Sequence, residues 1–248
     1  MSKSQAYIFI KQRRNSNARK LFLKIIDYVV FCYNNILQDQ ITYSKKYCLE
    51  NTAYHLEDYL KIRLVVDYLQ KRDNKLNCSY PNEILELEFN YETEKEYMQE
   101  GKLKSDKIDV IVSNLNLNNQ WNDIERENLY FVFECKRLLN KSKSNLYLSD
   151  IEKFVQREYT AFRFPFNGLI GFVEKSTFSI NEIIEDIDHK LQKHELINSV
   201  SKNDEELIMQ PYQINHFKNG RISKHLHINK GDIEVFHLFF DYSAIIVD

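Results

Sequence analysis

Two apolar segments carry charged residues at positions where a strand would be buried. In LYFVFECKRL, Glu134 and Lys136 stand two positions apart, and in KIDVIV, Asp109 interrupts a β-branched run. Side chains two positions apart on a strand face the same side, so Glu134 and Lys136 share one face while Cys135 points to the other. A buried ion loses solvation free energy that only close partners can restore. These charges therefore need partners or a chemical role.

Three of these side chains are suited to the hydrolysis of a phosphodiester. The chain between Asp109 and Glu134 leaves room for a loop, so their strands can be neighbours and their carboxylates can meet. Adjacent carboxylates repel unless a cation lies between them, and Mg²⁺ commonly takes one or two carboxylates with water and substrate phosphate. Lys136 beside them would orient or activate a water and offset negative charge on a phosphoryl group.

The elements that must position these residues follow from the spacing of apolar residues. It predicts helices over residues 16–38, 51–73, 149–164 and 179–194, and strands over residues 83–89, 107–112, 129–138 and 168–173. Residues 91–105 and 113–128 are expected to be polar connections. Turns at Asn219-Gly220 and Lys230-Gly231 predict a C-terminal β-meander. The expected fold class is α/β, with a mixed central β-sheet flanked by helices.

The helix predicted after Lys136 would begin with a capping box of Ser149 and Glu152. Its apolar residues are expected to pack inward, namely Ile151, Phe154, Val155, Tyr159 and Phe162. Polar residues lie nearer its other side, where some would border a groove and touch phosphates: Lys153, Gln156, Arg157 and Thr160.

With these residues in view, the chain resembles the PD-(D/E)XK nuclease superfamily, which has the restriction-endonuclease-like fold. Asp109 is similar to the family's strand aspartate, and Glu134-Cys135-Lys136 is similar to its Glu-x-Lys element. The resemblance covers roughly residues 51–173. It departs from the family in lacking the proline before the aspartate, and Asp106 at the strand start competes with Asp109 for the same role.

The resemblance implies catalytic roles for Asp109, Glu134, Lys136 and Glu57. Asp109 and Glu134 would bind the metal together with the main-chain carbonyl of Cys135, and Lys136 would serve the nucleophilic water. Glu57 in HLEDYL matches the family's assisting glutamate on the preceding helix, and Asp58 is a poorer match. Gln156 and Tyr159 are similar to an element of the helicase-associated exonucleases, but their spacing is one residue short.

A Mg²⁺-dependent nuclease follows from the resemblance, with Mn²⁺ as a substitute ion. DNA is favoured over RNA and an endonuclease over an exonuclease, in a bacterial setting such as phage defence or DNA processing. Lys153, Gln156 and Arg157 would contact the nucleic acid. Because many relatives dimerise to cut both strands, a homodimer is one expectation. The domain organisation would be an N-terminal helical extension over residues 1–45 and a restriction-endonuclease-like domain over residues 46–248.

Composition restricts the other classes of function. Of the 248 residues, 43% are hydrophobic and 13% aromatic, with 5 glycines and 3 prolines, so one large domain with a sizeable core is expected. The formal net charge of −2 argues against a globally basic nucleic-acid binder and leaves local patches to contact phosphates. Four cysteines without a CxxC pair favour reduced thiols in a cytoplasmic protein. No apolar run is long enough to span a membrane, and the N-terminus is a poor signal peptide.

Other interpretations of the charged residues stay open. A simple ion pair between Glu134 and Lys136 would produce the same sequence, and the chain would then be a catalytically inactive nucleic-acid-binding or partner-binding module with the same fold. Seven basic residues precede the first acidic residue, Asp27, which predicts either a solvated helix end or an arm on a nucleic-acid backbone.

The histidines and the single tryptophan have two interpretations each. Zinc binding is the less favoured role for the C-terminal histidines, and packing, surface or phosphate contacts are favoured: His216, His225, His227 and His237. Trp121 would cap its loop against the core rather than stack on a base.

Overall fold

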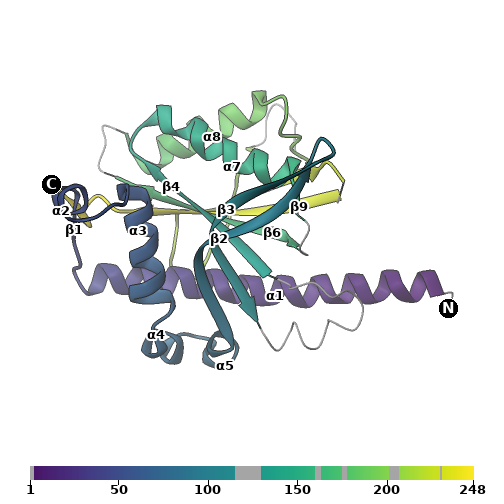
Figure 1. Cartoon of the computed structure of the whole chain (residues 1–248), viewed down its shortest axis with the longest axis horizontal. Coiled ribbons are helices and arrows are strands. Elements are labelled where there is room, and N and C mark those ends of the chain that lie inside the picture. The colour runs from purple at the N-terminus through teal and green to yellow at the C-terminus, as the bar shows by residue number, and fades with distance from the viewer. Residues whose placement is uncertain (1–2, 115–129, 160–162, 175–177, 201–206, 230) are drawn as a thin grey trace.

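A mixed eight-stranded sheet runs through the computed structural model, which describes residues 3–114, 130–159, 163–174, 178–200, 207–229 and 231–248 (Figure 1). Its order is β5-β2-β3-β4-β6-β9-β8-β7. β4, β6 and β9 are parallel to one another, and the remaining neighbours pair antiparallel. The strands are β2 (Leu87–Gln99), β3 (Lys102–Asn114), β4 (Tyr130–Leu138), β5 (Glu158–Tyr159), β6 (Arg163–Val173), β7 (Gln210–Pro211), β8 (Gly220–His227) and β9 (Gly231–Asp241). The expected α/β class with a mixed central sheet is confirmed.

Helices cover both faces of this sheet. The long helix α1 (Lys3–Gln38) crosses one face, while α7 (Ser144–Gln156) and α8 (Ile180–Lys193) lie on the other (Figure 1). Between Ala18 and Ile36, α1 contributes buried apolar side chains to the same core as β4, β6 and β9. Residues on the two sides of the expected boundary at residue 45 therefore share one hydrophobic core. None of the described helices combines the length and apolarity needed to cross a membrane.

Shorter elements complete the described chain. They are β1 (Tyr43–Ser44), α2 (Lys45–Asn51), α3 (Leu56–Leu64), a π-helix (Val65–Leu69), α4 (Arg72–Asn77), α5 (Pro81–Leu85), a 3₁₀ helix (Lys141–Lys143) and β10 (Ile246–Val247), which pairs in parallel with β1. The helix expected over residues 51–73 is thus a succession of shorter helices. The four cysteines are buried and unpaired.

Alternation along β4 places the charged residues. Phe131, Phe133 and Cys135 join the core beneath α1, while Val132 and Leu138 join the core beneath α7 and α8. Glu134 and Lys136 therefore face the α7 side, as the period of a strand requires. Close packing of the neighbouring strand holds this register: a side chain at Gly168 of β6 would collide with the ring of Phe133.

The hairpin of β2 and β3 contradicts two predictions. Residues 83–89 are not one strand, because Leu85 ends α5 and β2 begins at Leu87. Residues 91–105 are not a loose connection but paired strands joined at Glu100-Gly101, whose φ values are +52° and +73°. Positive φ at both central residues is the conformation of a two-residue hairpin turn. The sequence signal was weak because most of the outer hairpin is exposed on both faces.

The helix expected over residues 149–164 begins and ends earlier than predicted. Since α7 begins at Ser144, Ser149 lies mid-helix, where its hydroxyl donates to the carbonyl of Leu146, so the predicted capping box is wrong. Its inward residues Ile151, Phe154 and Val155 are buried as expected. Tyr159 is also buried, but it lies in β5, because the chain after Gln156 becomes extended and pairs with β2. Thr160 and Phe162 fall outside the described residues, as does Trp121.

The C-terminal part forms the expected meander, with one turn misplaced. Gly231, at φ +79°, opens β9 opposite His227 at the end of β8, and Lys230 falls outside the described residues. Asn219-Gly220 is not a two-residue turn, because Gly220 opens β8 opposite Leu238 and residues 212–219 connect β7 to β8. A capping box does occur at α8, where the Ser179 hydroxyl accepts from the Glu182 amide.

A buried chain of hydrogen bonds ties α7 to β8 and β9. Tyr147 Oη lies 2.9 Å from Nδ1 of His237, whose Nε2 lies 2.7 Å from Ser223 Oγ. That oxygen is also 2.7 Å from Nε2 of His225, whose Nδ1 lies 3.1 Å from Ser199 Oγ. We call these five residues the histidine chain. Burial lowers the pKa of His225 to about 4 and that of His237 well below its usual value, so both rings are neutral.

The histidine chain bears directly on the zinc hypothesis. Both ring nitrogens of His225 and of His237 already have partners, so neither ring can bind a metal without breaking the chain. His227 also has both ring nitrogens within hydrogen-bonding distance of backbone atoms, at Arg157 and Asn229. These three histidines thus have packing roles.

Candidate active site

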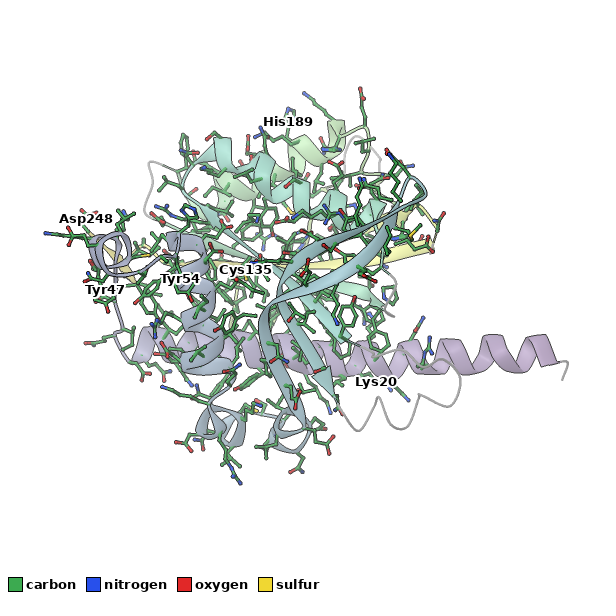
Figure 2. All side chains as sticks on the ribbon, viewed as in Figure 1. Lys20, Tyr47, Tyr54, Cys135, His189 and Asp248 are labelled. Carbon is green, nitrogen blue, oxygen red and sulfur yellow. The ribbon has the colours of Figure 1, made fainter. Side chains whose placement is uncertain are left out.

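Strands β3 and β4 separate at Asp109. Their ladder runs from Ser113 opposite Tyr130 to Val110 opposite Phe133 and then stops. The carboxylate of Asp109 instead accepts the backbone N–H of Cys135 on Oδ2 at 2.8 Å. The side chain thereby takes the place of a main-chain acceptor, and polar side chains from α3 and α7 gather where the strands part. Cys135 marks this region near the middle of the molecule (Figure 2).

Asp109 is held as a carboxylate by Lys61 on α3. The Nζ atom of Lys61 lies 2.8 Å from Oδ1 of Asp109, and the Lys61 residue is 2% exposed. Burial alone would raise the pKa of Asp109, but the charge and hydrogen bond of Lys61 outweigh it and lower that pKa. Burial likewise opposes the charge of Lys61, and the attraction of Asp109 keeps its pKa raised. The pair is therefore ionised.

Glu134 has the opposite electrostatic environment. It is 2% exposed, and its Oε1 atom is buried without a hydrogen-bond partner in the described structure. Burial first, then the nearby carboxylates of Asp109 and Asp150, raise the pKa of Glu134 well above its usual value. A hydrogen bond with Asp109 acts in the same direction. Glu134 and Asp109 therefore meet, as predicted, and Glu134 favours the neutral form when no cation lies beside it.

Lys136 is enclosed by two other acids. Its Nζ atom lies 3.4 Å from Oε1 of Glu57 and 3.2 Å from Oδ2 of Asp150. Oε2 of Glu57 accepts the backbone N–H of Arg137 at 2.8 Å, which fixes the α3 helix against β4. Burial opposes the charge of Lys136, but Asp150 and Glu57 outweigh it and raise its pKa. The structure thus brings Glu57 to the lysine of the expected site.

Sequence reasoning missed Lys61 and Asp150. Asp150 on α7 is fully buried between two ammonium groups, those of Lys136 and of Lys153, whose Nζ lies 2.8 Å from Oδ1. Lys61 had a usable signal, because it stands four residues after Glu57 and so shares its helix face. Asp150 had none, because α7 was expected to begin only one residue before it. We call the group Glu57, Asp58, Lys61, Asp109, Glu134, Lys136, Asp150 and Lys153 the charged cluster.

The three expected nucleic-acid contacts occupy different places. Lys153 belongs to the charged cluster and also reaches Asp106, at 3.9 Å. Arg157 forms an ion pair with Asp106 and lies over the ring of Tyr97 at 4.4 Å from its centroid. Gln156 points elsewhere, donating to the carbonyl of Leu196 at 2.9 Å.

Metal binding would use few side chains at this site. No group of three or more His, Cys, Asp and Glu side chains in the described part of the chain is arranged to hold an ion. The thiol of Cys135 cannot contribute, since it lies in the core beneath α1 and burial raises its pKa. Its main-chain carbonyl faces no such limit. Mg²⁺ commonly binds one or two carboxylates and keeps several waters, so Asp109, Glu134 and this carbonyl fit that ion. The Oε1 atom of Glu134, which has no hydrogen-bond partner in the described structure, would be available to such an ion.

An open hollow adjoins the cluster. It has a volume of about 420 Å³ and is bordered by Glu57, Asp58, Arg137, Lys143 and neighbouring apolar side chains of α2, α3 and α7. Glu57 belongs both to this hollow and to the surroundings of Lys136, so a ligand in the hollow would lie beside the candidate site.

Comparisons of the chain with protein-family models, with curated proteins and with solved structures each find no significant match.

Proposed function

We propose that the chain is a metal-dependent phosphodiesterase of the restriction-endonuclease-like fold that cleaves nucleic acid. One observation carries the proposal: a fully buried carboxyl group, Glu134, has an unpartnered oxygen beside the ionised Asp109 and on the same strand face as Lys136. A purely structural cluster gains nothing from a buried carboxyl oxygen without a hydrogen-bond partner, because leaving such an atom unmatched costs stability. A cation at Asp109 and Glu134 would remove that cost.

The side chains divide the chemistry between them. When bound, Mg²⁺ would supply positive charge that polarises the phosphate and lowers the pKa of a water. Asp109, Glu134 and the carbonyl of Cys135 would hold it. Because the pKa of Lys136 is raised, this residue acts as an ammonium group that orients the attacking water and offsets charge on the phosphoryl oxygens. Glu57 and Asp150 fix its position from two sides.

The substrate preference rests on local charge and on the family resemblance. With a net charge of −2, the whole molecule does not attract phosphates, but the strand that carries Asp109 exposes Lys102, Lys104 and Lys107 along the β2–β3 hairpin. DNA is the favoured substrate, cut internally, with phage defence or DNA processing as the setting and a homodimer as the form that cuts both strands. The choice of DNA, the internal cut, the setting and the homodimer come from the resemblance alone, and the local charge supports only contact with phosphates.

A second candidate is a non-catalytic module with the same fold. Asp109 already has Lys61 as a partner, and Lys136 already has Glu57 and Asp150, so these groups form ion pairs without any metal. In this alternative the cluster would only fix α3 and α7 against the sheet.

Cleavage of supercoiled plasmid separates the two candidates. We expect Mg²⁺ or Mn²⁺ to support nicking, a chelator to abolish it, and Lys136→Ala to reduce it by orders of magnitude while nucleic-acid binding persists. Parallel reactions with single-stranded DNA and RNA establish the substrate. Lys224→Ala, at an exposed site on β8, is the matched control and should cut normally. Wild-type protein that binds but never cuts with either ion would favour the non-catalytic module.

A further inference from the structure

The family resemblance leaves two members of the charged cluster without a role, Asp150 and Lys61, and of these Lys61 is the one that donates to Asp109. Its ammonium group lies among three carboxylates, at 2.8 Å from Asp109, 3.0 Å from Asp58 and 3.4 Å from Glu92. At 2% exposure it cannot touch a substrate. Three acids around one buried cation resemble the surroundings of a divalent ion more than those of an ordinary surface ion pair.

The backbone directs these acids toward one point. Glu92 has a φ of +50° and is skipped in the ladder between β2 and β3, as is Asp109 opposite it. A non-glycine residue in the left-handed region is uncommon and marks a local constraint. The result is that acids from α3, β2 and β3 converge on Lys61 alongside the expected metal position.

The contacts of Asp109 limit what else it can bind. Its Oδ1 accepts from Lys61 and its Oδ2 from the Cys135 amide. Each carboxylate oxygen offers about two acceptor positions, so two remain on the group, and the hydrogen bond with protonated Glu134 uses one of them when no ion is bound. A second divalent ion sharing Asp109 would have to use Asp58 or Glu92 as well, and the Lys61 charge already lies there.

We propose that Lys61 is a built-in cation that takes the place of a second metal ion, so that the site holds one divalent ion per chain. The inference rests on the proposed function, because it presupposes an ion at Asp109 and Glu134. Lys61 is a positioning residue in this view. It fixes Asp109 as a carboxylate, and the single exchangeable ion lies between Asp109 and Glu134.

Counting bound Mn²⁺ tests the proposal without any cleavage reaction. Titration of the full chain with Mn²⁺, followed by the loss of the free-ion electron paramagnetic resonance signal, should give one ion per wild-type chain and none for Glu134→Gln. Lys61→Met keeps the length of the side chain and removes its charge, which frees the three acids. It should bind two ions per chain.

Lys107 is a matched control, because it contacts Glu92, one of the three acids around Lys61. Lys107 reaches Glu92 at 3.7 Å, but its side chain is 70% exposed, whereas Lys61 is buried and donates to Asp109. Lys107→Met should therefore bind one ion with an affinity within about twofold of wild type, a difference of roughly 0.4 kcal/mol. Lys61→Arg keeps the charge and should also bind one ion.

The outcomes distinguish this inference from the proposed function. Two ions on the wild-type chain, or one ion of unchanged affinity on folded Lys61→Met, would overturn the inference and leave the nuclease proposal standing. No ion on the wild-type chain would overturn both. If Lys61→Met does not fold, Lys61→Gln replaces it, since an amide still hydrogen-bonds Asp109 without adding charge, and two ions are again expected.

Discussion

The α7 face of the sheet carries two buried polar networks, and they differ in how their polar groups are satisfied. The histidine chain is neutral, and four hydrogen bonds link its five residues in series. The charged cluster is built on ion pairs, and Glu134 within it keeps an oxygen without a hydrogen-bond partner. Both networks touch α7, the first through Tyr147 and the second through Asp150 and Lys153.

The difference indicates which network is structural. Buried polar groups are normally satisfied, and a neutral chain with every link made holds elements together at little cost. A buried carboxyl group next to another carboxylate lowers stability unless something else binds there. We therefore expect changes in the histidine chain to alter folding and changes at Glu134 to alter chemistry.

The largest expected effect comes from Glu134→Gln. The amide keeps the shape of the side chain but removes a metal ligand, so cleavage should fall by at least about a thousandfold. Its free energy of unfolding, measured by urea titration, should be unchanged or higher by about 1 kcal/mol, since burial and Asp109 already disfavour the charged form. A loss of more than about 2 kcal/mol would show that the carboxyl group is structural.

Asp150→Asn is the control within the same cluster. Asp150 is also fully buried, but its two carboxylate oxygens face the ammonium groups of Lys136 and Lys153, at 3.2 and 2.8 Å. Removing its charge should lower the free energy of unfolding by about 2–3 kcal/mol, because it leaves two lysines short of a partner. If Glu134→Gln raises the free energy of unfolding while Asp150→Asn lowers it, the metal position is at Glu134 and not at Asp150.

An intermediate effect is expected from His237→Phe. Phenylalanine fills the space of the ring but leaves Tyr147 and Ser223 without that partner, which should cost about 2–4 kcal/mol of unfolding free energy. Cleavage per folded molecule should match wild type. His216→Phe, at an exposed histidine on the β7–β8 connection, should change stability by less than about 0.5 kcal/mol. If folded His237→Phe loses cleavage, the histidine chain and the charged cluster depend on each other for activity.

The smallest expected effect is a difference in pH dependence. His225 has a pKa of about 4 in the folded protein against 6.5 normally, so its contribution to stability is present above pH 6.5 and is lost as the pH falls through 4. The raised pKa of Glu134 has the opposite sign, so its contribution is present below 4.5 and is lost as the pH rises through the folded pKa. Urea titrations should show wild type weakening toward pH 4. The free energy of unfolding of Glu134→Gln should equal that of wild type near pH 4 and exceed it by more as the pH rises. A difference that shrinks as the pH rises would contradict the raised pKa of Glu134.

The sequence by itself determined the strands at the centre of the sheet and the face on which their charges lie. Long apolar runs identify β4 and β6 because buried strands must be apolar on both faces. The two-residue period then places Glu134 and Lys136 together and Cys135 opposite them. Asp109 and Glu134 could be paired from the sequence because one connection joins their strands.

Only the tertiary structure decided which partners these charges have. Lys61 and Asp150 reach the site from α3 and α7, and a helix has no sequence signal for the strand against which it packs. The β2–β3 hairpin and the start of α7 were also missed, since an exposed hairpin lacks apolar alternation and the serine chosen as a cap lies mid-helix. Whether a buried acid is matched by a lysine, as Asp109 is, or keeps one oxygen without a hydrogen-bond partner, as Glu134 does, depends on distances between elements far apart in the chain. Local sequence pattern cannot encode those distances, because long-range packing sets them.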